Sequence, residues 1–145
     1  MAFDLETRRF ALSLSAVERI VPMAEITPLP GAPEIVAGVI NIRGRILPIF
    51  NVRRRFGLPE REVWLSDHLI IAATSRRTVA LWVDQALGVL ERSGESSAEG
   101  ILVGMDYVEG VVKLEDGLIL IHNLETFLSL DEGAALDGAL AANRE

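Results

Sequence analysis

The apolar residues of this chain fall in short runs of strand length, and turn residues follow most of these runs. Phe10, Leu12 and Leu14 alternate with polar or small residues, which is typical of a half-buried strand. Many short strands with few helices favour small β-barrels over a parallel sheet with crossover helices. The predicted strands are residues 2–5, 10–14, 37–42, 46–50, 68–73, 78–83, 86–92, 108–114 and 118–124.

Only a few segments carry a helical signal. Ser15 to Glu18 fit a capping box, so one short helical turn is expected to begin there. Asn51 can cap a short helix over residues 52–56. The remaining expectations are a linker over 60–67, a helical turn over 125–130, and an acidic, alanine-rich tail over 131–145 that is a short helix or disordered.

The charge is unevenly distributed along the chain, which has a net charge of −7. Residues 1–62 carry nine arginines and seven carboxylates, for +2, whereas residues 63–145 carry five basic and fourteen acidic side chains, for −9. An acidic chain is a poor general nucleic-acid binder, because phosphate contacts dominate that affinity. The uneven charge instead permits two differently charged surfaces, and so two partners.

The chain has no cysteine, which rules out disulfides, thiol nucleophiles and thiolate metal sites. No apolar run approaches the ~20 residues that a membrane helix needs. The first ten residues lack the basic and then apolar order of a signal peptide. A cytoplasmic protein that does not insert into a membrane is therefore expected.

No pattern in the sequence points to catalysis. His68 and His122 are isolated, and we interpret them as ordinary strand residues. Glu115-Asp116 precedes a glycine and is interpreted as a turn. Nucleophile, phosphate-loop and dinucleotide motifs do not occur, so no enzyme activity, cofactor or metal is predicted. The arginine run 53–55 is interpreted as the solvated face of the short helix, or as a contact with an acidic surface.

The stretch 38–50 reads GVINIRGRILPIF and predicts a hairpin with an arginine at its turn. Alternation places Ile40 and Ile42 on a core face, and Asn41 and Arg43 on the opposite face. Two interpretations of Arg43 follow. It points to water at a hairpin tip, or it presents its guanidinium to a carboxylate or to carbonyl groups of a partner.

Two glycines frame this hairpin. Gly44 fits a turn that needs a positive φ angle. Gly38 fits a β-bulge or a close approach of another backbone.

Three segments around this hairpin form a recognisable set: Val17-Glu18-Arg19-Ile20, Ile26-Thr27-Pro28-Leu29-Pro30-Gly31-Ala32-Pro33, and Gly38-Val39-Ile40-Asn41-Ile42-Arg43-Gly44-Arg45-Ile46-Leu47-Pro48-Ile49. Together they resemble the CheW-like domain of bacterial chemotaxis. The most specific part is the Asn-Ile-Arg-Gly element with the apolar strand that follows it. Further similarity to the family's later strands comes from Val83-Asp84, Gly88-Val89, the hairpin from Gly110 to Leu124, and Leu128. The resemblance spans roughly residues 1–130.

This resemblance implies a mainly β fold of two small five-stranded, SH3-like barrels that pack on a shared hydrophobic core. Residues 1–130 would form this single domain. The resemblance also implies a non-enzymatic adaptor that couples the cytoplasmic tip of methyl-accepting chemoreceptors to a histidine kinase of the CheA type. The regulatory domain of that kinase has the same fold, and the adaptor would be recruited to membrane receptor arrays.

The resemblance further assigns residues to partner contact. They are Val17, Glu18, Arg19, Ile20, Gly38, Asn41, Arg43 and Gly44, together with the groove between the two barrels. Two departures from the family stand out. The family often has a polar residue and then glutamate after the valine, whereas this chain has Glu18-Arg19, so an acidic contact from the second position would be reversed in charge. Asn51 stands where the family often has aspartate, and either residue caps a helix.

Two alternatives stay open at this point. One is a CheW-like adaptor of a non-flagellar pathway, such as pilus motility or second-messenger signalling. The other is a small β-barrel that binds nucleic acid through Arg43, Arg45 and the run 53–55. The −9 of residues 63–145 argues against nucleic acid.

Overall fold

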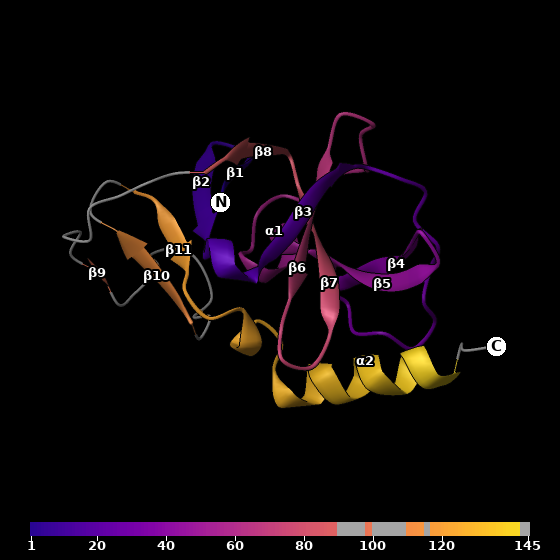
Figure 1. Cartoon of the computed structure of the whole chain (residues 1–145). Coiled ribbons are helices and arrows are strands. Elements are labelled where there is room, and N and C mark those ends of the chain that lie inside the picture. The colour runs from indigo at the N-terminus through magenta and orange to yellow at the C-terminus, as the bar shows by residue number, and fades with distance from the viewer. Residues whose placement is uncertain (90–97, 100–109, 115–116, 143–145) are drawn as a thin grey trace.

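Short strands form two sheets in the computed structural model, which describes residues 1–89, 98–99, 110–114 and 117–142 (Figure 1). The first sheet has the strand order β8-β1-β2-β11-β10-β9, and the second has the order β3-β6-β7-β5-β4. Neighbouring strands are antiparallel except β2–β11 and β5–β7, which are parallel. The strands are β1 (Ala2–Leu5), β2 (Arg8–Leu12), β3 (Val17–Pro22), β4 (Val36–Ile42), β5 (Arg45–Asn51), β6 (His68–Ala73), β7 (Thr78–Val83), β8 (Gln85–Gly88), β9 (Ala98–Glu99), β10 (Val111–Leu114) and β11 (Ile119–Ile121).

The predicted mainly β fold in two strand units is confirmed. The second sheet has the expected five strands, and the first gains the two-residue β9 as a sixth. The predicted hairpins β1–β2, β4–β5, β6–β7 and β10–β11 are all present. The helical segments in the described residues are η1 (Leu14–Ala16), α1 (Val52–Arg55), η2 (Leu124–Thr126) and α2 (Leu130–Ala142), where η denotes a 3₁₀ helix.

The segment after β2 differs from its prediction. Leu14 does not continue the strand but opens η1 with an exposed side chain, and the helical turn ends at Ala16 instead of beginning at Ser15. The residues that follow form β3, because pairing with β6 satisfies their backbone groups. Glu18 forms an ion pair with Arg45 of β5 instead of completing a capping box.

Other boundaries differ by a few residues. The strand predicted over 86–92 is β8, which ends at Gly88, where φ is 104°. The helical turn predicted over 125–130 is η2, and α2 begins at Leu130. The predicted positions 90–92, 108–109 and 115–116 lie outside the described residues.

The two sheets share one core, as predicted. All five phenylalanines of the chain join in a continuous series of ring contacts that crosses between the sheets. The ring centroids are 5.4 Å apart for Phe3–Phe10, 4.8 Å for Phe10–Phe56, 6.1 Å for Phe56–Phe127 and 5.8 Å for Phe127–Phe50. Because all five side chains are fully or almost fully buried, this series ties the two strand units into one body.

The central strands β6 and β7 are buried on both faces. Ile70 and Leu81 point into the shared core. Leu69, Ile71 and Trp82 point to the opposite face, into a second core that includes residues of β4 and β5 of the same sheet. A strand covered on both sides needs no polar face, which explains the continuous apolar runs in these two segments.

The acidic tail forms α2, which packs beneath the β6–β7 hairpin in Figure 1. Its Leu136 is fully buried in the shared core. Ser129 and Glu132 form a reciprocal capping box at its start, with hydrogen bonds of 3.1 and 2.9 Å. Burial alone would raise the pKa of Glu132, but hydrogen bonds from the Ser129 N–H and from Arg55 hold that pKa below its usual value.

The arginine run at α1 does not form a solvated face, so that interpretation is wrong for two of its three residues. Arg53 is buried, and Arg55 is half-buried and binds Glu132 at 2.5 Å. Arg54 is exposed, yet it also binds carboxylates, those of Glu34 and Glu60. Successive side chains of a helix point about 100° apart. Because α1 packs against the protein on one side, the three consecutive arginines differ in burial and in their carboxylate partners.

Candidate interaction surfaces

The first candidate surface joins the edge strand β3 to the tip of the β4–β5 hairpin. We name it the β3–hairpin surface, and its residues are Glu18, Arg19, Ile20, Asn41, Arg43, Arg45 and Ile46, all exposed. The Arg45 guanidinium lies 3.1 Å from the Glu18 carboxylate, although 27 residues separate them in the chain. This ion pair brings the two predicted partner-binding segments together on one surface.

The hairpin tip has a fixed shape. Ile42 pairs with Arg45, so Arg43 and Gly44 form a two-residue turn. Both turn residues have positive φ angles, 51° and 86°, as in the turns that match the twist of a hairpin. The Asn41 side-chain oxygen accepts a hydrogen bond of 2.8 Å from the Gly44 N–H. The turn therefore holds Arg43 outward, and within the described residues Arg43 has no ion pair.

Gly38 lies behind this surface. It is buried, and the register of β4 with β5 shifts between Val36 and Gly38, which is the predicted bulge. The predicted close approach is also present, because a Cβ at this position would lie 2.4 Å from the Thr27 carbonyl oxygen. Thr27 and Val39 exchange two backbone hydrogen bonds of 2.9 and 2.8 Å here. Gly38 thus lies behind the hairpin face and fixes the position of the hairpin.

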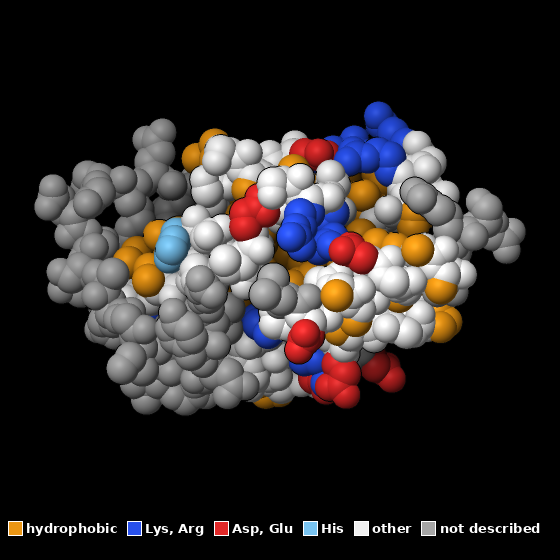
Figure 2. Space-filling view, turned by 90° about the horizontal axis from the view of Figure 1, so that it is seen from below, with side chains coloured by type: hydrophobic (Ala, Val, Ile, Leu, Met, Phe, Trp, Pro, Cys, Tyr) orange, Lys and Arg blue, Asp and Glu red, His pale blue; other side chains and the backbone are white. Residues whose placement is uncertain are grey.

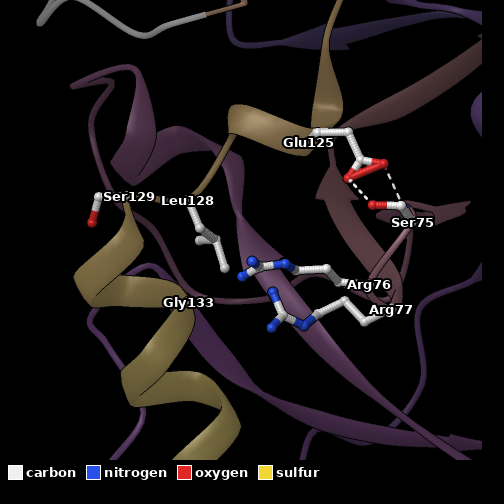
Figure 3. Close-up of a pocket in the computed structure, with 7 residues that line it drawn as sticks. All are labelled: Ser75, Arg76, Arg77, Glu125, Leu128, Ser129 and Gly133. Atoms are coloured by element: carbon white, nitrogen blue, oxygen red, sulfur yellow. Dashed lines mark hydrogen bonds between the residues drawn. The ribbon is translucent and has the colours of Figure 1, made fainter.

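A second candidate site is a pocket of about 310 Å³ where the β6–β7 turn meets the chain before α2. Figure 3 shows Arg76 and Arg77 reaching from the turn toward Leu128 and the first turn of α2. Glu125 closes one side, where its carboxylate accepts hydrogen bonds of 2.5 and 3.1 Å from the backbone N–H and the hydroxyl of Ser75. The full lining is Ser75, Arg76, Arg77, Glu125, Leu128, Ser129 and Gly133.

The charges around this pocket leave one cation available. Arg77 binds Asp137 of α2 at 2.5 Å, whereas Arg76 is exposed and has no ion pair among the described residues. Seen from below, basic and acidic side chains lie next to one another across this face of the molecule, with apolar surface between them (Figure 2). A concave site that presents Leu128 opposite an available guanidinium suits an acidic side chain next to an apolar one.

The strand register places both candidate sites at the same end of the second sheet. Val17 pairs with Ala72 next to the β6–β7 turn, and the parallel β5 and β7 both start at this end. At the other end, Pro22 pairs with His68. The hairpin tip and the pocket therefore lie at the same end of the second sheet, and the loop before β6 lies at the other end.

That opposite end is held by Asp67, which is buried at the start of β6. The Arg61 guanidinium donates two hydrogen bonds of 2.9 and 2.7 Å to its carboxylate, forming a bidentate ion pair. The Trp64 N–H and the Trp82 indole N–H each donate a further hydrogen bond of 2.9 Å. Burial alone would raise the pKa of Asp67, but these hydrogen bonds hold it below its usual value. The hydrogen bond to Asp67 is the main cause of the raised pKa of Arg61.

Asp84 extends this network between the two sheets. It accepts hydrogen bonds from the side chains of Arg53 and Arg61 and from the Glu6 N–H. Arg53 also binds the Glu6 carboxylate and the Pro59 carbonyl oxygen. The network thus joins the β1–β2 turn, α1, the loop before β6 and the end of β7.

The described residues contain no group of three or more acidic or histidine side chains placed to hold a metal ion. Within the same part of the chain, no helix is long and apolar enough to cross a membrane.

Comparison with known proteins identifies the family. The model of the CheW-like domain matches residues 1–132. The chain belongs to the CheW-like domain family. It is 32% identical over 141 residues to chemotaxis protein CheW of Bacillus subtilis, covering 94% of this chain and 85% of that protein. It is 30% identical over 139 residues to chemotaxis protein CheW of Rhizobium meliloti, covering 93% of this chain and 90% of that protein.

A solved structure shares the CheW-like fold. The scaffolding protein TtCheW from Thermoanaerobacter tengcongensis has a TM-score of 0.76 and 27% sequence identity to this chain. The match covers 90% of this chain and 92% of the TtCheW chain. CheW-like proteins form a family of chemotaxis adaptors and scaffolds, and the resemblance given by the sequence is confirmed at this level.

The residues predicted for partner contact occupy three kinds of position in this CheW-like chain. The exposed ones are Glu18, Arg19, Ile20, Asn41, Arg43 and Gly44. Val17 is half-buried and packs against the shared core, and Gly38 is buried. Of the five cations that the nucleic-acid alternative needs, four already bind carboxylates of this chain, and only Arg43 has no such partner in the described part of the chain.

The pocket residues were not predicted from the sequence. Arg76 and Arg77 carry only a turn signal, and Glu125 lies 50 residues from Ser75 in the chain. No local pattern indicates that these segments meet. The expectation of a groove between the barrels was the only signal, and it named no residues.

Proposed function

We propose that this protein is a non-enzymatic adaptor that couples methyl-accepting chemoreceptors to a histidine kinase on the cytoplasmic side of a receptor array. One observation carries the proposal. Residues assigned to partner contact by family resemblance gather with a pocket at one end of the second sheet. An adaptor needs two contacts close enough to act together, and this end offers a projecting tip beside a concave site.

The two sites suit different partner shapes. The hairpin tip is convex and rigid and carries Arg43 outward, which suits a concave face of a folded domain. We therefore assign the β3–hairpin surface to the kinase regulatory domain. The pocket is concave and is lined by Leu128 and Arg76, which suits a projecting helical tip that carries an acidic side chain. We assign the pocket to the receptor.

Paired alanine variants test both assignments. Arg43→Ala and Arg76→Ala are each measured for binding to the kinase regulatory domain and to a receptor tip fragment, with thermal melts as the fold control. Both side chains are exposed, so each variant should stay within about 0.5 kcal/mol of the parent in stability. An interface arginine costs about 2 kcal/mol or more when truncated, roughly thirtyfold in affinity.

The expected result is a crossed pattern. Arg43→Ala weakens kinase binding and spares the receptor, whereas Arg76→Ala does the reverse. If both variants fold normally and bind both partners as tightly as the parent, these surfaces are ordinary solvated turns and the assignment fails.

A further inference from the structure

The pocket beside the β6–β7 turn has less room than a helix needs. Its volume is about 310 Å³. Two turns of a helix with its side chains occupy roughly 1,000 Å³, at a diameter of about 11 Å and a rise of about 5.4 Å per turn. A helical partner therefore enters this pocket fully only if one of the pocket walls moves.

Of these walls, α2 is the one that can move without breaking a strand pair. The β6–β7 turn closes a hairpin of the second sheet. Glu125 belongs to η2, which packs on the shared core through the buried Leu124 and Phe127. Ser129 and Gly133 form the wall at the start of α2 (Figure 3). Movement of α2 thus opens the pocket and leaves both sheets intact.

The helix α2 has little intrinsic stability. Among its described side chains, Leu136 is the only large one that is fully buried. Gly133 and Gly138 lie inside the helix, although a Cβ at either position would meet no neighbouring atom within 4 Å. Packing therefore does not require glycine there, and each glycine lowers the stability of the helix. Since a 13-residue helix is marginal in water on its own, α2 loses its helical structure when it leaves the body.

The contacts of α2 show which kind of helix fits its place. Glu132 binds Arg55 at 2.5 Å, and Asp137 binds Arg77 at 2.5 Å. Leu136 lies between the two acidic residues in the chain and is buried in the shared core. When α2 leaves, both arginines lose these carboxylates beside an exposed apolar site. That site suits an acidic helix with a leucine between its acidic side chains.

We name the surface beneath α2, marked by Gly31, Arg55 and Arg77, the α2 seat. We propose that α2 competes in cis with the receptor for this seat. In the free protein α2 occupies the seat, and α2 leaves when an acidic helix of the receptor tip binds there and in the adjoining pocket. This proposal rests on the assignment of the pocket to the receptor. The apparent affinity for the receptor is then reduced by the fraction of molecules in which α2 is released.

An engineered disulfide in the full chain tests the release of α2. A Cβ at Gly31 would lie 3.8 Å from the Cβ of Ala139, which is about the mean Cβ–Cβ distance in disulfides. Gly31→Cys with Ala139→Cys therefore joins α2 to the loop before β4, and the chain has no other cysteine. Because φ is 86° at Gly31, the substitution is strained. The reduced and oxidised forms of the same variant share that strain, so these two forms are compared as monomers.

Two exposed positions on α2 provide a second measurement. Gly138→Ala strengthens the helix and Ala135→Gly weakens it, and neither residue lines the pocket. The difference in helix propensity between the two residue types changes the released fraction about fivefold. All forms are titrated with the receptor tip fragment. Binding of the kinase regulatory domain is the control, because the β3–hairpin surface contains no residue of α2.

Oxidation of the disulfide variant should weaken receptor binding at least tenfold and leave kinase binding unchanged. Gly138→Ala should weaken receptor binding about fivefold, and Ala135→Gly should strengthen it about fivefold. Equal receptor affinity of the two redox forms, no change in either helix variant, or a loss of both partners on oxidation overturns the proposal and leaves the receptor assignment standing. If neither the parent nor any variant binds the receptor fragment, the receptor assignment itself is wrong, and the proposal falls with it.

Discussion

Replacing Arg53 by methionine is expected to destabilise the protein without touching either candidate surface. Arg53 is 1% exposed and binds Glu6, Asp84 and the Pro59 carbonyl oxygen. Methionine keeps the apolar stem but removes the charge and its hydrogen bonds. Removing one partner of a buried ion pair costs about 3–5 kcal/mol when the other partner is left buried and alone.

The expected loss of stability for Arg53→Met is smaller than this range. The Glu6 side chain is 40% exposed and can regain water, and Asp84 keeps its hydrogen bonds from Arg61 and the Glu6 N–H. We therefore expect a loss of about 2–3 kcal/mol in the free energy of unfolding. For a chain of this length, that corresponds to a fall of roughly 5–10 °C in Tm.

The neighbouring Arg54→Met is the matched control for urea denaturation and thermal melts. Arg54 belongs to the same arginine run, but it pairs with Glu34 and Glu60 at the surface. Exposed ion pairs contribute about 0–1 kcal/mol, so this variant should unfold close to the parent. If Arg53→Met unfolds at the same urea concentration as Arg54→Met, the network around Asp84 does not stabilise the contact between the two sheets.

Three further predictions concern the fold and its pH dependence. Gly38→Ala should cost about 2 kcal/mol or more in urea denaturation, because its Cβ would lie 2.4 Å from the Thr27 carbonyl oxygen; a parent-like midpoint contradicts this. The pKa of Asp67 is lowered in the folded state, so its stabilising effect is complete above its unfolded pKa of about 3.9 and is lost as the pH falls toward the lower folded value. Asp67→Asn should flatten the acid limb of stability against pH, and an unchanged limb would count against the assignment. Leu136→Ala should cost about 2–4 kcal/mol and Leu140→Ala less, since Leu136 is fully buried and Leu140 only partly; equal losses would mean that α2 docks differently.

The sequence predicts most of the strands because their signals are local. Alternation and turn residues define the β4–β5 hairpin, and both explanations offered for Gly38 are present together in the structure. The prediction of a capping box at Ser15 was wrong because it used only the local sequence, whereas the structure of this segment is set by distant contacts. Pairing with β6 and the ion pair between Glu18 and Arg45 depend on contacts that no window of sequence contains.

The candidate sites also differ in whether they could be predicted from local sequence. The hairpin tip could be predicted, because a single motif holds Asn41, Arg43 and Gly44. The pocket and the charge network could not, because their residues meet only after folding. The run 53–55 shows the difference most clearly, since three identical residues in a row bind carboxylates from five separate segments of the chain.

The proposed coupling requires that one molecule of this protein binds a receptor and a kinase at the same time. The direct measurement is co-sedimentation of the purified kinase regulatory domain with immobilised receptor tip fragments, with and without this protein. The kinase domain should be retained only when this protein is present, and Arg43→Ala should reduce that retention while the adaptor itself stays bound to the receptor. Binding of each partner alone, with mutual exclusion when both are supplied, would contradict it.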